Sequence, residues 1–135
     1  MTEVSEVETI NPHDLVIPVS SYSHGITAGD LVFVAGQVSF DEEGNVVGVG
    51  DVAAQTRQAI ANVEKVLRAA GARLSDVVST TVYLTSFDNY ADYDRAYGEC
   101  FGGHRPARAT VKAELVKPEL LVEVQAIAVR KRGGV

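Results

Sequence analysis

The spacing of apolar residues along the chain changes between strand-like and helix-like, and the changes predict the order of its elements. Apolar residues recur every three or four positions over Val52–Ala70, which predicts a helix. Asp51 is placed to cap this helix and Gly71 to end it. A second stripe, largely aromatic, predicts another helix over Asp88–Phe101, and its rings are best explained as core packing.

The segments around these helices are rich in Val, Thr, Phe and Tyr, which favours strands. The predicted strands are Leu15–Val19, Leu31–Ser39, Val46–Val49, Val77–Leu84 and two more within His104–Arg132. Residues 1–14 are expected to form a loosely ordered lead-in to one domain spanning residues 1–135. The resulting order, β-β-β-α-β-α-β-β, predicts an α+β fold with two helices packed on one face of a sheet.

The last predicted strand is apolar on both faces. One face carries Val122, Val124, Ala126 and Ala128, and the other carries Leu121, Ile127 and Val129. Helices on one side of the sheet would leave the second face uncovered. We therefore expect a homo-oligomer in which these faces meet, with a site at the interface.

Charge and composition narrow the classes of partner. The net charge of −6 makes nucleic acid an unfavourable partner, and the polar N-terminus and short apolar runs predict neither a secretory signal nor a membrane span. One cysteine, Cys100, fits a reducing cytoplasm and is expected to be a small buried side chain rather than a nucleophile. The three histidines lack metal-ligand spacing, so no metal is expected.

Two charged residues stand where the last two strands should be apolar. Arg108 follows Pro106, and Glu123 interrupts an aliphatic run. On neighbouring strands, they would provide an anchor for an anionic substrate with a base beside it. The alternatives are an ordinary ion pair for Arg108, and for Glu123 a structural pairing with Arg108 or Lys112.

Two further positions could serve a pocket. Gly36 interrupts a strand, which indicates a β-bulge or a close approach by a ligand or by another part of the backbone. Tyr22 lies in a loop of small residues and either closes over a pocket or simply packs.

Four stretches together resemble the Rid (YjgF-type) family of reactive intermediate deaminases. They are SYSHG, VFVAGQVS, DVAAQTRQAIANVEKVLRAAGARLSDVVSTTVYL and RPARATVKAEL…VEVQAIAVRKR, and the likeness covers roughly residues 20–130 in order. The resemblance implies a chorismate-mutase-like fold, a homotrimer with sites between subunits, and no cofactor. It also implies hydrolysis of enamines and imines such as 2-aminoacrylate to 2-oxo acids and ammonia.

The resemblance also assigns residues. It places the substrate-carboxylate arginine at Arg108, the water-orienting acid at Glu123, and pocket positions at Tyr22 and Gly36. The chain departs from the family pattern at three further pocket positions: Ala35 replaces a common serine, Asp94 a common asparagine and Thr110 a frequent cysteine.

The resemblance thus implies a 2-iminobutanoate/2-iminopropanoate-type deaminase that binds a small imine or 2-oxo acid, and we expect it to be cytoplasmic. The alternative is a non-catalytic ligand-binding relative that regulates a partner enzyme or acts as a chaperone. A ribonuclease-like activity, attributed to some relatives, is disfavoured by the acidic charge.

Overall fold

The computed structural model describes residues 6–18 and 20–131, and these form one mixed sheet with two helices. The strands are β1 Val7–Ile10, β2 Gly25–Ala28, β3 Leu31–Gln37, β4 Val77–Leu84, β5 Ala107–Lys112 and β6 Val122–Val129; the helices are α1 Val52–Ala69 and α2 Tyr90–Phe101. Short 3₁₀ turns, Leu74–Asp76 and Phe87–Asn89, precede β4 and α2. The α+β class and the pattern β-β-β-α-β-α-β-β are confirmed, although two of the first three strands lie at other residues than predicted.

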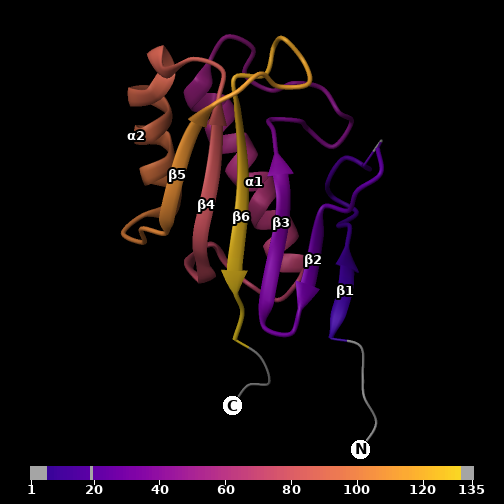
Figure 1. The fold of residues 1–135 in the computed structure, drawn as a ribbon. Helices are drawn as coiled ribbons and strands as arrows, with labels where there is room; N and C mark the ends of the chain where they lie inside the picture. Colours follow the sequence, from indigo (N-terminus) through magenta and orange to yellow (C-terminus); the bar gives the residue numbers. More distant parts are fainter. Residues whose placement is uncertain (1–5, 19, 132–135) are drawn as a thin grey trace, which may run out of the picture.

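The sheet runs β1-β2-β3-β6-β4-β5, so the last strand lies in its middle. Among the described strands, β4 and β5 pair in parallel and the other neighbours are antiparallel. Figure 1 shows α1 behind the middle of the sheet and α2 beside its β5 edge, with the opposite face uncovered. A parallel pair needs a crossover connection, and α2 provides it between β4 and β5.

Helix α1 forms where local signals agree. The Asp51 carboxylate accepts a hydrogen bond from the Ala54 amide at 3.0 Å, which caps the first turn. Gly71, at φ +81°, lies in the left-handed region just beyond the helix, where glycine is favoured. The apolar stripe between these ends packs on the sheet.

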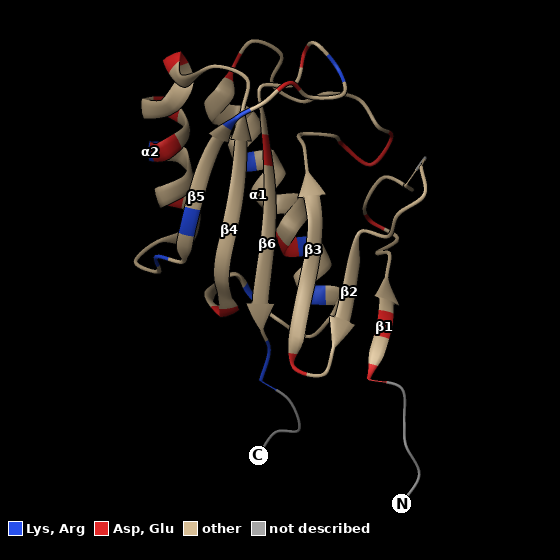
Figure 2. Cartoon of the chain, viewed as in Figure 1, with Lys and Arg blue, Asp and Glu red and all other residues tan. Residues whose placement is uncertain are grey.

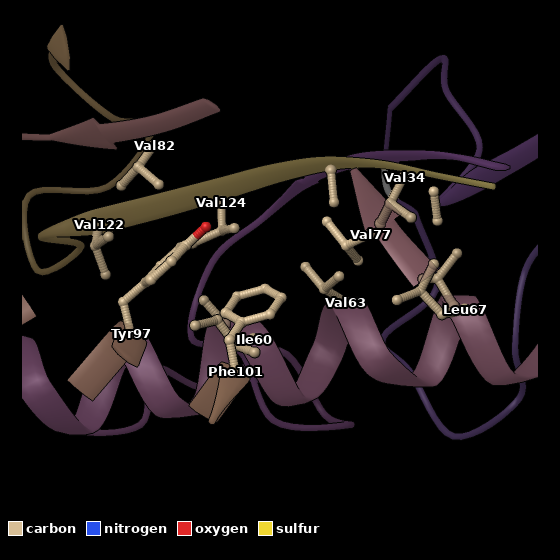
Figure 3. Close-up of a cluster of buried hydrophobic side chains, with 14 of the residues drawn as sticks. Val34, Ile60, Val63, Leu67, Val77, Val82, Tyr97, Phe101, Val122 and Val124 are labelled. Atoms are coloured by element: carbon tan, nitrogen blue, oxygen red, sulfur yellow. The ribbon is translucent and has the colours of Figure 1, made fainter. Parts of the chain in front are cut away.

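The core lies between the helices and one face of the sheet. Figure 3 shows aliphatic side chains from the strands meeting those of α1 and the rings of α2. Ile60, Val63 and Leu67 of α1 are at most 1% exposed, as are Val122 and Val124 of β6. Burying each such side chain contributes about 1.5–3 kcal/mol, so this layer fixes which face of β6 points inward.

Two predicted strands are wrong. Over Leu15–Val19, the described residues form no strand: Leu15 is buried in the core as irregular chain and the Val16 carbonyl accepts from His24, while Val19 lies outside the described residues. In Val46–Val49, Val46 makes an isolated bridge to Phe40. Gly48 then adopts φ +78°, which turns the chain toward α1.

Two short strands take their places. β1 forms within the expected lead-in and is mostly exposed, so apolar alternation gives it little signal. β2, with the sequence GITA, pairs with both β1 and β3. The part of the lead-in at residues 1–5 lies outside the described residues.

The open face of the sheet carries Ile127 and Val129, as the sequence analysis expected, together with Leu31 and Phe33 of β3. Leu121, also expected on this face, instead precedes β6 and packs against the core. Leu31, Phe33 and Val129 are about two-fifths exposed, at 39%, 40% and 42%. Their neighbours in the strands, Val32 and Ala128, are fully buried on the helix side. The described helices include none with the length and apolar character needed to cross a membrane.

Candidate functional site

Arg108 of β5 lies against α2, on the helix side of the sheet. Its Nη1 donates to Asp94 Oδ1 at 2.9 Å and its Nη2 donates to the Tyr90 hydroxyl at 2.8 Å. Tyr90 and Asp94 are four residues apart, so one side of α2 presents both groups to the guanidinium. The side chain of Arg108 is 20% exposed and that of Asp94 is 51% exposed. The ion pair therefore opens to solvent on its acidic side.

A tyrosine platform supports the guanidinium. The Arg108 Cζ lies 4.8 Å from the centre of the Tyr97 ring and 5.1 Å from that of Tyr93, which are cation–π distances. The Tyr97 hydroxyl shares a hydrogen bond with Thr80 at 2.7 Å, and Tyr93 shares one with Thr110 at 2.9 Å. These bonds hold both rings in place beneath the charge.

Burial alters the proton affinities of this platform. It raises the pKa of Tyr93 to about 12, although the hydrogen bond with Thr110 and the charge of Arg108 act in the opposite sense. Burial also raises the pKa of Tyr97. For Arg108, burial alone would lower the pKa, but the hydrogen bond to Asp94 and the neighbouring tyrosines raise it overall. The arginine is therefore a permanent cation, and the two tyrosines are neutral at physiological pH.

A hollow of about 350 Å³ gives a small molecule access to this group. It is lined by Asp94, Tyr97, Gly98, His104, Arg105, Pro106 and Arg108. Figure 2 shows acidic positions along α2 beside the basic positions of β5. We call Arg108, Asp94, Thr110 and the tyrosines Tyr90, Tyr93 and Tyr97 the arginine cluster.

Glu123 lies on the opposite, open face. It alternates along β6 with Val122 and Val124, both fully buried on the helix side. Burial raises the pKa of the Glu123 carboxyl. No ion pair to Glu123 forms among the described residues, so the predicted alternative of a pairing with Arg108 or Lys112 is wrong for the isolated chain. A half-buried carboxylate without a counter-charge is suited to accept a proton.

Gly36 makes room for that carboxylate. A Cβ added at Gly36 would overlap Glu123 Oε2 and would lie 2.7 Å from its Cδ. The β3–β6 register shifts between Val34 and Gln37, which confirms the predicted bulge. The bulge and the missing side chain together form a niche for Glu123.

The buried side chains of His24 and Gln37 stabilise the bulge through hydrogen bonds. A carbonyl can only accept, so the 2.6 Å contact between His24 Nε2 and the Val16 oxygen assigns the imidazole proton to Nε2. His24 Nδ1 then accepts from the Gln37 amide at 3.1 Å, and the same amide donates to the Ala35 carbonyl at 3.2 Å. Both side chains are at least 96% buried. This network fixes the backbone on either side of Gly36.

Tyr22 and Ala35 complete the open-face group. Tyr22 is 49% exposed, and its ring meets that of His24 edge-on at 5.9 Å. Tyr22, His24 and Gly36 line one hollow of about 270 Å³. Ala35 follows the buried Val34, and strand alternation places its methyl group on the open face. We call Glu123, Gly36, Tyr22 and Ala35 the carboxylate group.

The expectation that Arg108 and Glu123 stand side by side on neighbouring strands is wrong. β4 lies between their strands. Arg108 is paired with Thr80, whose hydroxyl faces α2, whereas Glu123 is paired with Tyr83, three residues further along β4. An odd offset in a strand reverses the face. The arginine cluster and the carboxylate group therefore lie on opposite faces of one chain.

The sequence analysis identified the charged candidate residues but missed the residues that hold them in place. The tyrosines of α2 were predicted as core packing, and Tyr93 and Tyr97 do pack in the core while also carrying Arg108. Their spacing with Asp94 along one helical stripe was the available signal. The pairing of His24 with Gln37 had no such signal, because the two residues are 13 positions apart.

Cys100 is half-buried against the core, and burial raises the pKa of its thiol, which disfavours the reactive thiolate. Within residues 6–18 and 20–131, no three His, Cys, Asp or Glu side chains come together in an arrangement that could hold a metal ion.

Comparison with known proteins gives a consistent result. Residues 14–130 match the sequence profile of the family described as endoribonuclease L-PSP. A RutC family protein of Pyrococcus horikoshii is 38% identical over 114 residues, which are 84% of this chain and 90% of that protein. Two solved Escherichia coli structures also superpose closely. The YjgF gene product has a TM-score of 0.85 at 31% identity, covering 92% of this chain and 99% of its own. TdcF with bound serine has a TM-score of 0.84 at 27% identity, with the same coverage.

Proposed function

The chain belongs to the endoribonuclease L-PSP family, which includes the YjgF, RutC and Rid proteins, and we propose that it hydrolyses small 2-imino acids to 2-oxo acids and ammonia. The proposal is supported by two chemically complementary groups, a carboxylate-binding cation on an aromatic platform and a carboxyl group whose pKa burial raises. The bound serine of TdcF supports a small amino-acid-like ligand for this chain as well.

The reaction requires one water and no redox step. Arg108 binds the substrate carboxylate and fixes the imine carbon in position. Glu123 accepts a proton from water as the oxygen attacks that carbon, giving a tetrahedral carbinolamine. Glu123 then passes this proton to the nitrogen, the C–N bond breaks and ammonia leaves. The hydroxyl group gives its own proton to Glu123 as the carbonyl forms, and Glu123 returns that proton to solvent. Burial moves the pKa of the Glu123 carboxyl upward, toward neutral pH, and a general base is most effective when its pKa lies near the pH at which it works.

The arginine cluster and the carboxylate group lie on opposite faces of the sheet, and this placement supports the proposed assembly. One chain cannot bring both to the same substrate, because β4 and the thickness of the sheet separate them. Arg108 lies on β5, the outer strand of the sheet, and Glu123 lies on the apolar open face. A second copy whose β5 edge approaches that face would complete a site and cover Leu31, Phe33 and Val129. A homotrimer with three such interfaces closes the arrangement.

A second function remains the alternative: binding of a small ligand without turnover, in regulation of a partner enzyme or as a chaperone. The ion pair with Asp94 favours binding without turnover in one respect, because Asp94 already takes a hydrogen bond from the Arg108 guanidinium that should bind the substrate carboxylate. The name endoribonuclease given to the family is poorly matched to a chain of net charge −6.

The variant Glu123→Gln separates catalysis from binding. An amino-acid oxidase can generate the imine in situ, and ammonia release is then followed with and without the protein. We expect the wild type to accelerate release and Glu123→Gln to lose about 10²- to 10⁴-fold of that acceleration. Pyruvate binding should survive, because Arg108 is unchanged. Imine decay at the buffer rate with wild-type protein would refute the proposal and leave the binding function.

A further inference from the structure

Asp94 lies beside Arg108, so its carboxylate would interact electrostatically with the charge of any ligand bound to that arginine. It contacts Arg108 Nη1 through Oδ1, it is half exposed, and it lines the same hollow. A guanidinium has five N–H groups, and the contacts to Asp94 and Tyr90 use one on each terminal nitrogen. Arg108 therefore keeps donors for a ligand carboxylate, but that carboxylate must bind close to Asp94.

The two carboxylates would share one guanidinium, at a separation of about 5 Å. Like charges at that distance weaken binding by about fourfold at the dielectric of bulk water and by a few hundredfold at that of a protein surface, so we expect about tenfold for the half-exposed Asp94. Arg105 lines the hollow too and offsets part of this repulsion, but Asp94 is the group in direct contact with Arg108. The repulsion disappears for a ligand that carries a positive charge next to its own carboxylate.

We propose that Asp94 is a specificity-determining residue that favours the zwitterionic, nitrogen-protonated form of a 2-imino acid over the anionic 2-oxo acid. This inference rests on the proposed function for its ligand class. The protonated C=N nitrogen lies one bond from the carbon that bears the carboxylate, so a carboxylate on Arg108 brings the positive nitrogen within reach of Asp94. Hydrolysis replaces that nitrogen with a neutral carbonyl oxygen. The product then keeps its negative charge, loses its compensation and is expelled by Asp94.

The same residue therefore acts at two stages of one cycle. It holds the imine in the protonated state that water attacks most readily, and it speeds release of the product. It is a substrate-discriminating group rather than a proton carrier. The competing explanation is that Asp94 is only a structural partner that fixes the guanidinium on its tyrosine platform.

L-Alanine and pyruvate provide a matched pair of probes, since they share a carbon skeleton and a carboxylate and differ in the charge at C2. Calorimetric titration of the assembled protein with each gives a ratio of dissociation constants. For Asp94→Asn we expect pyruvate to bind about tenfold more tightly and alanine to bind equally or more weakly. Asp92→Asn is the matched control. Asp92 is on the same helix and pairs with Arg95 at 2.9 Å on the surface, so the ratio should stay at the wild-type value.

An unchanged ratio in Asp94→Asn would overturn the inference, as would an equal change for both probes, the result that a structural role predicts. Failure of both probes to bind the wild type would overturn it as well. The outcome is independent of turnover. A shifted ratio in a protein that does not hydrolyse imines would support the charge discrimination and refute the deaminase, whereas hydrolysis with an unshifted ratio would do the reverse.

Discussion

Replacing Gly36 with alanine tests whether the niche around Glu123 is functional. The new methyl carbon would overlap Glu123 Oε2 and lie 2.7 Å from Cδ and 3.0 Å from Cγ. The clashing atoms all belong to one flexible side chain, so Glu123 can rotate away while the backbone stays. Moving a side chain off its preferred rotamer costs about 0.5–1.5 kcal/mol, which a folded domain tolerates.

Catalysis should suffer far more than stability. A displaced carboxyl cannot align the water, so Gly36→Ala should lose most of the general-base contribution, about 10²- to 10⁴-fold in kcat, or about 3–5 kcal/mol of barrier. The assay is ammonia release from an imine generated in situ, with thermal unfolding measured beside it. Gly103→Ala is the control, because a Cβ there meets nothing within 4 Å and its φ is not positive.

A double-mutant cycle distinguishes displacement of Glu123 from simple blockage of the pocket. If alanine acts through Glu123, then Gly36→Ala combined with Glu123→Gln should be about as slow as Glu123→Gln alone. Additive losses would mean that the methyl group excludes the substrate independently. Wild-type kcat in Gly36→Ala would refute the reasoning altogether.

Two further outcomes follow from the arginine and the carboxyl. Arg108→Lys should impair kcat/KM nearly as much as Arg108→Ala, because an ammonium loses the planar two-point grip and the stacking on Tyr97; wild-type kcat/KM in the lysine variant would show a structural ion pair instead. Because burial raises the folded-state pKa of Glu123 above its unfolded value, its contribution to stability is present in acid and is lost as pH rises through the folded pKa. Glu123→Gln should therefore have a higher urea midpoint than the wild type at pH 7, with the gap narrowing toward pH 4; a lower midpoint at pH 7 would indicate a counter-charge from another subunit.

The parts of the fold that sequence predicts best are those with local causes. Helix α1 needs a cap at Asp51, an apolar stripe and a stop at Gly71, all within 21 consecutive residues, and it forms with boundaries close to those predicted. The strand Leu15–Val19 was mistaken because its apolar content is real but serves burial of Leu15 in irregular chain. β2 was missed because its four residues, which begin with a glycine, are too few to show the apolar alternation that identifies a strand.

The candidate site divides in the same way. The identities of Arg108, Glu123 and Gly36 could be anticipated from charge or flexibility in otherwise apolar strands. Their arrangement could not, because the faces of β5 and β6 depend on a register set through β4 and on a strand order in which the last strand enters the middle of the sheet. Asp94 meets Arg108 only through the packing of α2 on the sheet. Sequence thus predicted the chemical groups, and topology decided which of them meet.

The separation of the arginine cluster from the carboxylate group has a genetic consequence. In the proposed trimer, each subunit lends its arginine to one neighbour and its glutamate to the other, so no subunit owns a complete centre. A lesion in one subunit then silences one centre of three, and the wild-type residues of that subunit still serve the next. Two defective alleles, one lacking the arginine and one lacking the glutamate, can restore each other in a mixed assembly, because some interfaces combine the intact half of each. In such a trimer, a change at the interface between copies would therefore disable a centre as surely as the loss of Arg108 or Glu123.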